Sequence, residues 1–179
     1  MKSLRFFLPV VLLSLSAVAL AQSDAQKSFD KLKTLVGSWE GHVATLPLQA
    51  DIEGKLMQVS LRATSMGNAL MHEMTGTGRP EDPITMLYLD GDRLLLTHYC
   101  DAGNRPRMTG KMSPDGKTVA FAFLDVDGST KYGHMHHAVF TVIDANHHTE
   151  DWTYMMPGDK PVQAHFDLLR TKCREAYLW

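Results

Sequence analysis

Histidine is the residue type in this chain best suited to chemistry, and its nine copies are unevenly spread. His134, His136 and His137 fall in one short segment, while His98 and His165 lie in two others. Alternate side chains of a strand share a face, so His134 and His136 should point the same way and His137 the opposite way. Together with His98 or His165 they could bind a divalent metal. The alternative is that these histidines are ordinary hydrogen-bonded surface or core residues.

Two histidine–carboxylate pairs could support general acid–base catalysis if the fold brings their members within hydrogen-bond reach. They are His98 with Glu73 and His136 with Glu150. The sequence contains no Gly-x-Ser-x-Gly turn, no His-Glu-x-x-His motif and no glycine-rich phosphate loop. No catalytic residue is therefore assigned, and an enzyme that uses His98 as acid or base on a small substrate is one hypothesis among three.

Aromatic and methionine side chains are numerous enough to line a binding cavity. The chain has 11 methionines, among them Met57, Met74, Met135 and Met156. Their flexible, polarizable thioethers suit flat or irregular apolar ligands, but they also fill gaps in ordinary cores, and with histidine they can bind Cu(I). The candidate ligand-binding residues are Trp39, Tyr88, His98, Tyr99, Phe121, Phe123, Trp152 and Tyr154.

The segments that carry these residues are predicted to be β-strands. Apolar and mixed runs of about 5 to 10 residues alternate with turn signals from Ser38 onward, a spacing typical of sandwiches and barrels. Asp90-Gly91-Asp92, between leucine-rich runs, predicts a tight antiparallel hairpin over 86–99. The other expected strands include Trp39–Thr45, Ile52–Thr64, Ala69–Thr77, Thr118–Leu124, Met135–Ile143, Trp152–Met156 and Val162–Arg170.

About nine or ten strands result, with no room for the crossover helices that parallel strands need. Strands that are apolar or mixed on both faces, such as Ala120–Phe123, suit a closed sheet, which also has no exposed edges. The fold class expected is therefore all-β, an antiparallel up-and-down barrel. His147 and His148 flank a turn and are expected to be solvated.

One short amphipathic helix is predicted over 26–36, before the first strand. Phe29, Leu32 and Leu35 recur at helical spacing, and Gly37 ends the pattern. This helix followed by Gly37-x-Trp39 resembles the start of lipocalin-like, calycin-type barrels, and the whole mature chain looks like an uncharacterised bacterial lipocalin-like family. The resemblance implies a barrel in which Trp39 closes one end.

A second resemblance is to nitrobindin-type haem barrels. Their last strands carry a histidine that ligates iron, followed by apolar residues and a basic end, and His165-Phe-Asp-Leu-Leu-Arg170 is similar to that segment. The resemblance implies haem bound through His165. The sequence departs from that family at His42, where a further glycine is expected.

The N-terminus has the layout of a secretory signal peptide. Lys2 and Arg5 precede an apolar stretch, and small residues at 19 and 21 predict cleavage after Ala21. The apolar stretch is too short for a membrane span, and no cysteine follows the cleavage site for lipid attachment. We therefore expect a periplasmic or secreted domain, 22–179, without a stable membrane anchor.

Charge and cysteine content narrow the function classes further. The mature chain keeps 16 basic and 20 acidic side chains, so no basic face for nucleic acid is expected. Cys100 and Cys173 could form a disulfide after export or remain free thiols, and no Cys/His spacing predicts structural zinc.

Three functions follow, in order. The first is an exported protein that holds a small, largely apolar molecule in the barrel lumen. The second is a haem or metal protein that uses His165 or the group of His98, His134 and His136. The third is the small-substrate enzyme.

Overall fold

The computed structural model describes residues 22–77 and 83–171. The predicted signal peptide, 1–21, and Cys173 of the predicted disulfide lie outside the described residues. Within the described ranges, no helix is long and apolar enough to cross a membrane.

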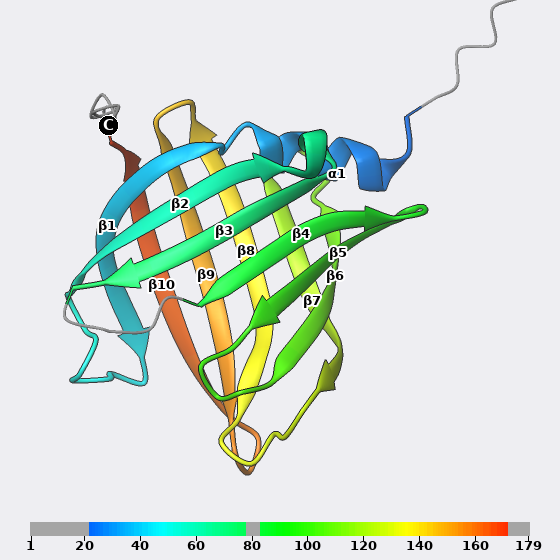
Figure 1. The fold of residues 1–179 in the computed structure, drawn as a ribbon. Coiled ribbons are helices and arrows are strands. Elements are labelled where there is room, and N and C mark those ends of the chain that lie inside the picture. The colour runs from blue at the N-terminus through cyan, green and yellow to red at the C-terminus, as the bar shows by residue number, and fades with distance from the viewer. Residues whose placement is uncertain (1–21, 78–82, 172–179) are drawn as a thin grey trace, which may run out of the picture.

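Ten antiparallel strands form one closed barrel, as Figure 1 shows, in which every strand pairs with its neighbours in the chain and the last pairs with the first. This confirms the predicted fold class. The strands are β1 (Gly37–Leu46), β2 (Leu56–Thr64), β3 (Ala69–Gly76), β4 (Ile84–Asp90), β5 (Arg93–Tyr99), β6 (Arg105–Met112), β7 (Thr118–Asp127), β8 (His134–Asp144), β9 (His147–Met156) and β10 (Lys160–Arg170).

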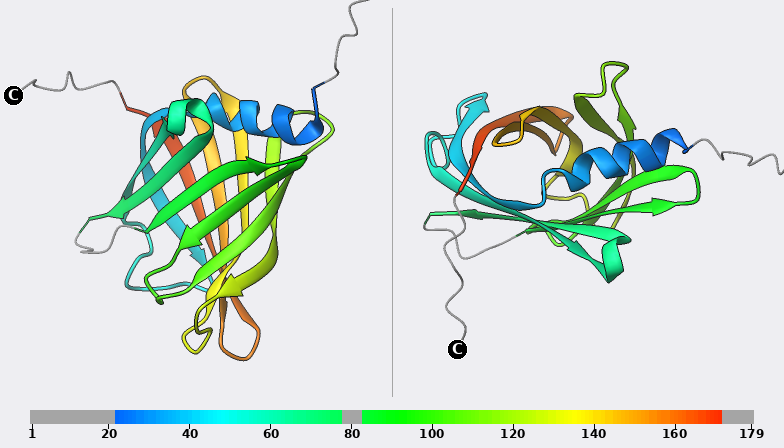
Figure 2. Two further views of the ribbon diagram at one scale, coloured as in Figure 1. Left: turned by 45° about the vertical axis from the view of Figure 1, so that its right-hand side comes forward. Right: turned by 90° about the horizontal axis from the view of Figure 1, so that it is seen from above.

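Helix α1 (Asp24–Lys33) lies across one end of the barrel, as Figure 2 shows from above. It begins earlier than predicted because the Ser23 hydroxyl accepts a hydrogen bond from the backbone N–H of Gln26 and caps the first turn. Its buried face carries Phe29 and Leu32, which join the barrel core. The helix therefore closes this end of the barrel with apolar side chains.

Trp39 completes the closed end. Its side chain is buried in the core, and its Nε1–H donates to the Leu35 carbonyl oxygen at 2.8 Å. The guanidinium carbon of Arg170 lies 4.0 Å from the centre of the indole ring, a cation–π geometry. The position that the resemblance implied for Trp39 is confirmed.

The barrel closes where β1 meets β10, and this contact is very tight. Gly41 lies opposite Leu168, and a Cβ placed on Gly41 would stand 1.8 Å from the Asp167 carbonyl oxygen. Only glycine lets the two backbones approach this closely.

Two strand boundaries differ from the prediction. The segment 47–55 forms turns rather than the start of a strand, because β2 begins only at Leu56. Strand β9 begins at His147, five residues before the predicted start. His148 therefore lies within a strand and is fully buried, so the expectation that it is solvated is wrong.

Candidate functional site

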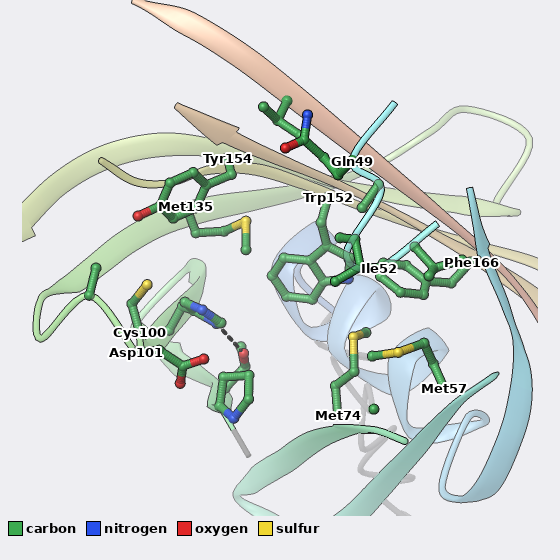
Figure 3. Close-up of a pocket in the computed structure, with 18 of the residues that line it drawn as sticks. Gln49, Ile52, Met57, Met74, Cys100, Asp101, Met135, Trp152, Tyr154 and Phe166 are labelled. Atoms are coloured by element: carbon green, nitrogen blue, oxygen red, sulfur yellow. Dashed lines mark hydrogen bonds between the residues drawn. The ribbon is translucent and has the colours of Figure 1, made fainter. Parts of the chain in front are cut away.

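A cavity of about 400 Å³ lies inside the barrel, away from the end that α1 covers. Connections β1–β2 and β5–β6 supply part of its lining through Ile52 and Cys100, and both lie at the end opposite the helix. Apolar side chains dominate the walls, and Figure 3 shows several of them around the common space. They are Val43, Ile52, Met57, Met74, Met135, Trp152, Met156, Val162, Ala164 and Phe166.

A short polar stripe interrupts this apolar lining on three adjacent strands. His72 of β3 is opposite Thr85 of β4, and Thr85 is opposite His98 of β5. All three are buried and line the cavity. The stripe follows from period-two alternation, because His72 lies on the same face as the fully buried Leu70, and Thr85 on the same face as Leu87.

His98 is hydrogen-bonded on one side only. Its Nδ1 lies 2.8 Å from the Thr85 hydroxyl, while its Nε2 has no hydrogen-bond partner among the described residues. Burial, reinforced by the nearby His72, lowers the pKa of His98 to about 4. The imidazole is therefore neutral at neutral pH.

Glu150 lies fully buried behind His72 and receives hydrogen bonds from three side chains. Its carboxylate oxygens lie 2.9 Å from Nε2 of His72, 3.1 Å from Nε2 of His148 and 2.9 Å from Nε1 of Trp152. Burial alone would raise the pKa of Glu150, but His72 and His148 lower it well below its usual range. An ionised carboxylate only accepts hydrogen bonds, so all three nitrogens donate to it.

This network fixes the wall of the cavity. Trp152 is held by Glu150, and its ring lies 5.6 Å from that of His72 and 5.7 Å from that of His98 between centroids. On the other side, His148 packs edge-on against Trp39, 4.2 Å between centroids. The network thus connects the closed end of the barrel to the cavity.

The predicted acid–base pairs do not form. His98 is paired with Thr85 rather than Glu73, and Glu150 binds His72 and His148 rather than His136. With three donors already on its oxygens, Glu150 is poorly placed to take a proton from a ligand.

Three of the eight predicted wall residues line the cavity: His98, Trp152 and Tyr154. The remaining five lie elsewhere. Trp39 and Phe121 are in the solid core, Tyr88 bonds Thr97 from the outer face, Tyr99 is exposed, and Phe123 packs against His134 and His136.

The four predicted metal ligands do not come together either. His134 and His136 do share a face, with Nε2 of the first 3.2 Å from Nδ1 of the second, but neither lines the cavity that contains His98. Partial burial and its neighbour His136 lower the pKa of His134. In the part of the chain that the structure describes, no group of three or more His, Cys, Asp or Glu residues is arranged to hold a metal ion.

His165 does not fit a haem ligand of the lumen. Ala164 and Phe166 on either side of it line the cavity, so His165 points to the outer face, where Nδ1 lies 2.6 Å from Asp151. Its side chain is 49% exposed. The haem site implied by the nitrobindin resemblance is therefore wrong at this residue.

Sequence reasoning missed the role of His72 and assigned Glu150 the wrong partner. The available signal was parity, since His72 alternates with the apolar residues Leu70 and Met74, and Glu150 with Trp152. Cys100 was anticipated only as half of a disulfide, yet it is half-buried at the cavity, and burial raises the pKa of its thiol.

No known family model and no curated protein sequence matches this chain. Solved structures do match its fold. The M. tuberculosis protein Rv2717c gives a TM-score of 0.58 at 14% identity, over 81% of this chain and 98% of that chain. The S-type phycobiliprotein lyase CpeS from Guillardia theta gives 0.53 at 10% identity, over 86% and 99%.

A third similar structure is a protein of unknown function from the DUF3598 family of Nostoc punctiforme, with a TM-score of 0.53 at 12% identity. The alignment covers 78% of this chain and 49% of that one, so this chain spans about half the length of that protein. At such identities the similarity shows the fold alone, and that fold is a calycin-like barrel.

Proposed function

We propose that this protein binds a small, largely apolar molecule in its barrel cavity, and that it does so outside the cytoplasm after losing residues 1–21. The observation that carries the proposal is the cavity of about 400 Å³ with its methionine and aromatic walls. Cavities of roughly 300–1,000 Å³ with apolar walls and few polar groups are typical of small-molecule sites.

The composition of the walls supports a ligand with an irregular or flexible shape. Met57, Met74, Met135 and Met156 all line the cavity, and unbranched thioethers adapt their conformation to whatever they contact. Trp152 offers a flat surface whose orientation Glu150 fixes. A pocket with one rigid aromatic wall and several adaptable side chains favours binding over a reaction that needs fixed catalytic groups.

The test is a fluorescence titration of the purified protein with N-phenyl-1-naphthylamine, a neutral apolar probe. We expect saturable binding with one site per chain. In Ala164→Phe, the new ring occupies the cavity, and we expect at least about tenfold weaker binding, since the probe and the ring compete for the same volume.

Gln163→Phe is the matched control, because it adds the same ring one residue away on the exposed outer face of β10. It should bind the probe like the unmodified protein. Near-UV circular dichroism would confirm that both variants fold. Equal binding by Ala164→Phe, or no saturable binding by the unmodified protein, would count against the proposal, and native mass spectrometry of protein from its own host would identify the occupant.

A further inference from the structure

We propose that the ligand carries a neutral carbonyl oxygen and that the N–H at Nε2 of His98 donates the hydrogen bond that recognises it. This inference rests on the proposed function and deepens it, because it names the polar group of the ligand and the atom that binds it.

The tautomer of His98 follows from the hydrogen bonds of Thr85. Within the described part of the chain, the Thr85 hydroxyl has one partner, Nδ1 of His98 at 2.8 Å. If Nδ1 carried the proton, the buried Thr85 O–H would have no acceptor, which is costly. If Thr85 donates instead, Nδ1 is the acceptor and the ring proton lies on Nε2.

Nε2 of His98 is accessible from the cavity. His98 lines the cavity, and Nε2 is not among the polar atoms that are both shut off from solvent and unpartnered, in contrast to Nδ1 of His72 and of His148. Its N–H therefore faces space that a ligand can fill. The low pKa of His98, caused by burial and by His72, keeps the ring neutral, so it donates only one ring proton to the cavity at neutral pH.

The charge of the surroundings favours a neutral acceptor over a carboxylate. Glu150 is already a buried anion, bonded to the same Trp152 ring that lies 5.7 Å from His98. A ligand carboxylate beside His98 would be a second anion in a region of low dielectric, and a neutral imidazole does not offset its loss of hydration. A ketone, aldehyde or ester carbonyl accepts the same hydrogen bond without this cost.

The geometry also argues against metal binding at this nitrogen. A metal at Nε2 would force the ring proton to Nδ1, and the Thr85 hydroxyl would then lose its acceptor. The hydrogen bond that prepares His98 to donate therefore opposes its use as a ligand.

The experiment compares three nine-carbon probes as competitors of N-phenyl-1-naphthylamine at pH 7. They are nonan-2-one, nonanoic acid and non-1-ene, which offer a neutral carbonyl, an anion and no strong acceptor. We expect the ketone to bind about five- to tenfold more tightly than the alkene, as one net hydrogen bond allows. The acid should be the weakest competitor.

Two variants assign the effect to His98. His98→Phe keeps a ring but removes the donor, and it should abolish the preference for ketone over alkene while leaving alkene affinity nearly unchanged. His98→Gln places an amide N–H near the position of Nε2 and should restore part of the preference. Nitrogen NMR of the unmodified protein should show the tautomer with the proton on Nε2.

The outcomes separate the two proposals. If none of the probes and no N-phenyl-1-naphthylamine bind, the proposed function fails. If the probes bind but ketone and alkene compete equally, if nonanoic acid competes best, or if the NMR spectrum shows the proton on Nδ1, only the present inference is overturned. A Soret shift on haem addition that is lost in His98→Phe would also overturn it.

Discussion

The two ends of the barrel are built from the same alternating strands but differ in what they enclose. At the closed end, α1 and Trp39 fill the interior with tightly packed apolar side chains. Toward the other end, the strands leave a cavity whose wall includes His72, Thr85 and His98. Polar groups are thus buried where there is space for a second molecule, and Glu150 lies at the boundary. We infer that the closed end supplies stability and the open end selectivity.

The largest effect should come from the closed end. Trp39→Ala removes a fully buried indole, and we expect the free energy of unfolding to fall by about 3–5 kcal/mol. Urea denaturation would measure this. Affinity for N-phenyl-1-naphthylamine, in the fraction that remains folded, should change less than about threefold, since Trp39 does not line the cavity. A loss of affinity as large as the loss of stability would break the division between the two ends.

The boundary should respond in both properties. Glu150→Gln replaces a carboxylate with an amide that has one acceptor oxygen for three N–H donors, and we expect a loss of about 3 kcal/mol in unfolding free energy. The emission of Trp152 should also shift as its hydrogen bond weakens. Glu40→Gln, on the exposed face of β1, is the control and should change neither. Unaltered stability of Glu150→Gln would show that the network is dispensable.

The open end should make stability depend on pH through His98. Its pKa is about 4 in the folded protein and 6.5 in the reference state, so only the unfolded chain gains a proton as the pH falls below 6.5. Stability is therefore lost on acidification, by about 2 kcal/mol between pH 7 and pH 5.

His98→Phe should lack that part of the slope, because the variant has no ring proton to gain. His134 and His137 also have lowered pKa values, but they are present in both proteins and cancel in the comparison. Urea titrations at the two pH values would measure the difference. Parallel pH dependence of the two proteins would contradict a neutral, buried His98.

The smallest effect should come from the outer surface. Arg107 donates to Asp125 through Nε at 2.7 Å, but both side chains are nearly half exposed. Arg107→Ala should cost less than about 1 kcal/mol and leave probe binding unchanged, since solvent screens exposed ion pairs. A cost comparable to that of Trp39→Ala would mean that the outer face contributes to the fold as much as the core does.

The fold was predictable because its signals are local. Alternation and turn residues identify most strands, and Gly91 has the positive φ of 58° that an Asp-Gly turn requires. The segment 47–55 was mistaken for a strand since Ile52 is apolar, yet that side chain packs against the core from a turn. Sequence periodicity does not distinguish these two ways of burying one residue.

The site was predictable only in part, because its geometry depends on which face of each strand points inward. Tyr88 and Tyr99 have the aromatic character of wall residues but alternate with the buried Leu87 and His98, which places them on the outer face. The register of β8 also shifts between Met135 and His137, and such a bulge has no clear signature in the sequence. The pairing of His72 with Glu150, 78 residues apart, depends on the closure of the sheet.

The contact of β1 with β10 has a consequence for the order of events during synthesis. Arg170 donates hydrogen bonds to the carbonyl oxygens of Val36 and Ala145, and β10 supplies one whole side of β1. The first strand therefore has an unpaired edge until nearly all of the chain has left the ribosome. Folding cannot finish from the N-terminus onward, and the chain stays competent for threading through a narrow channel until its last strand is available.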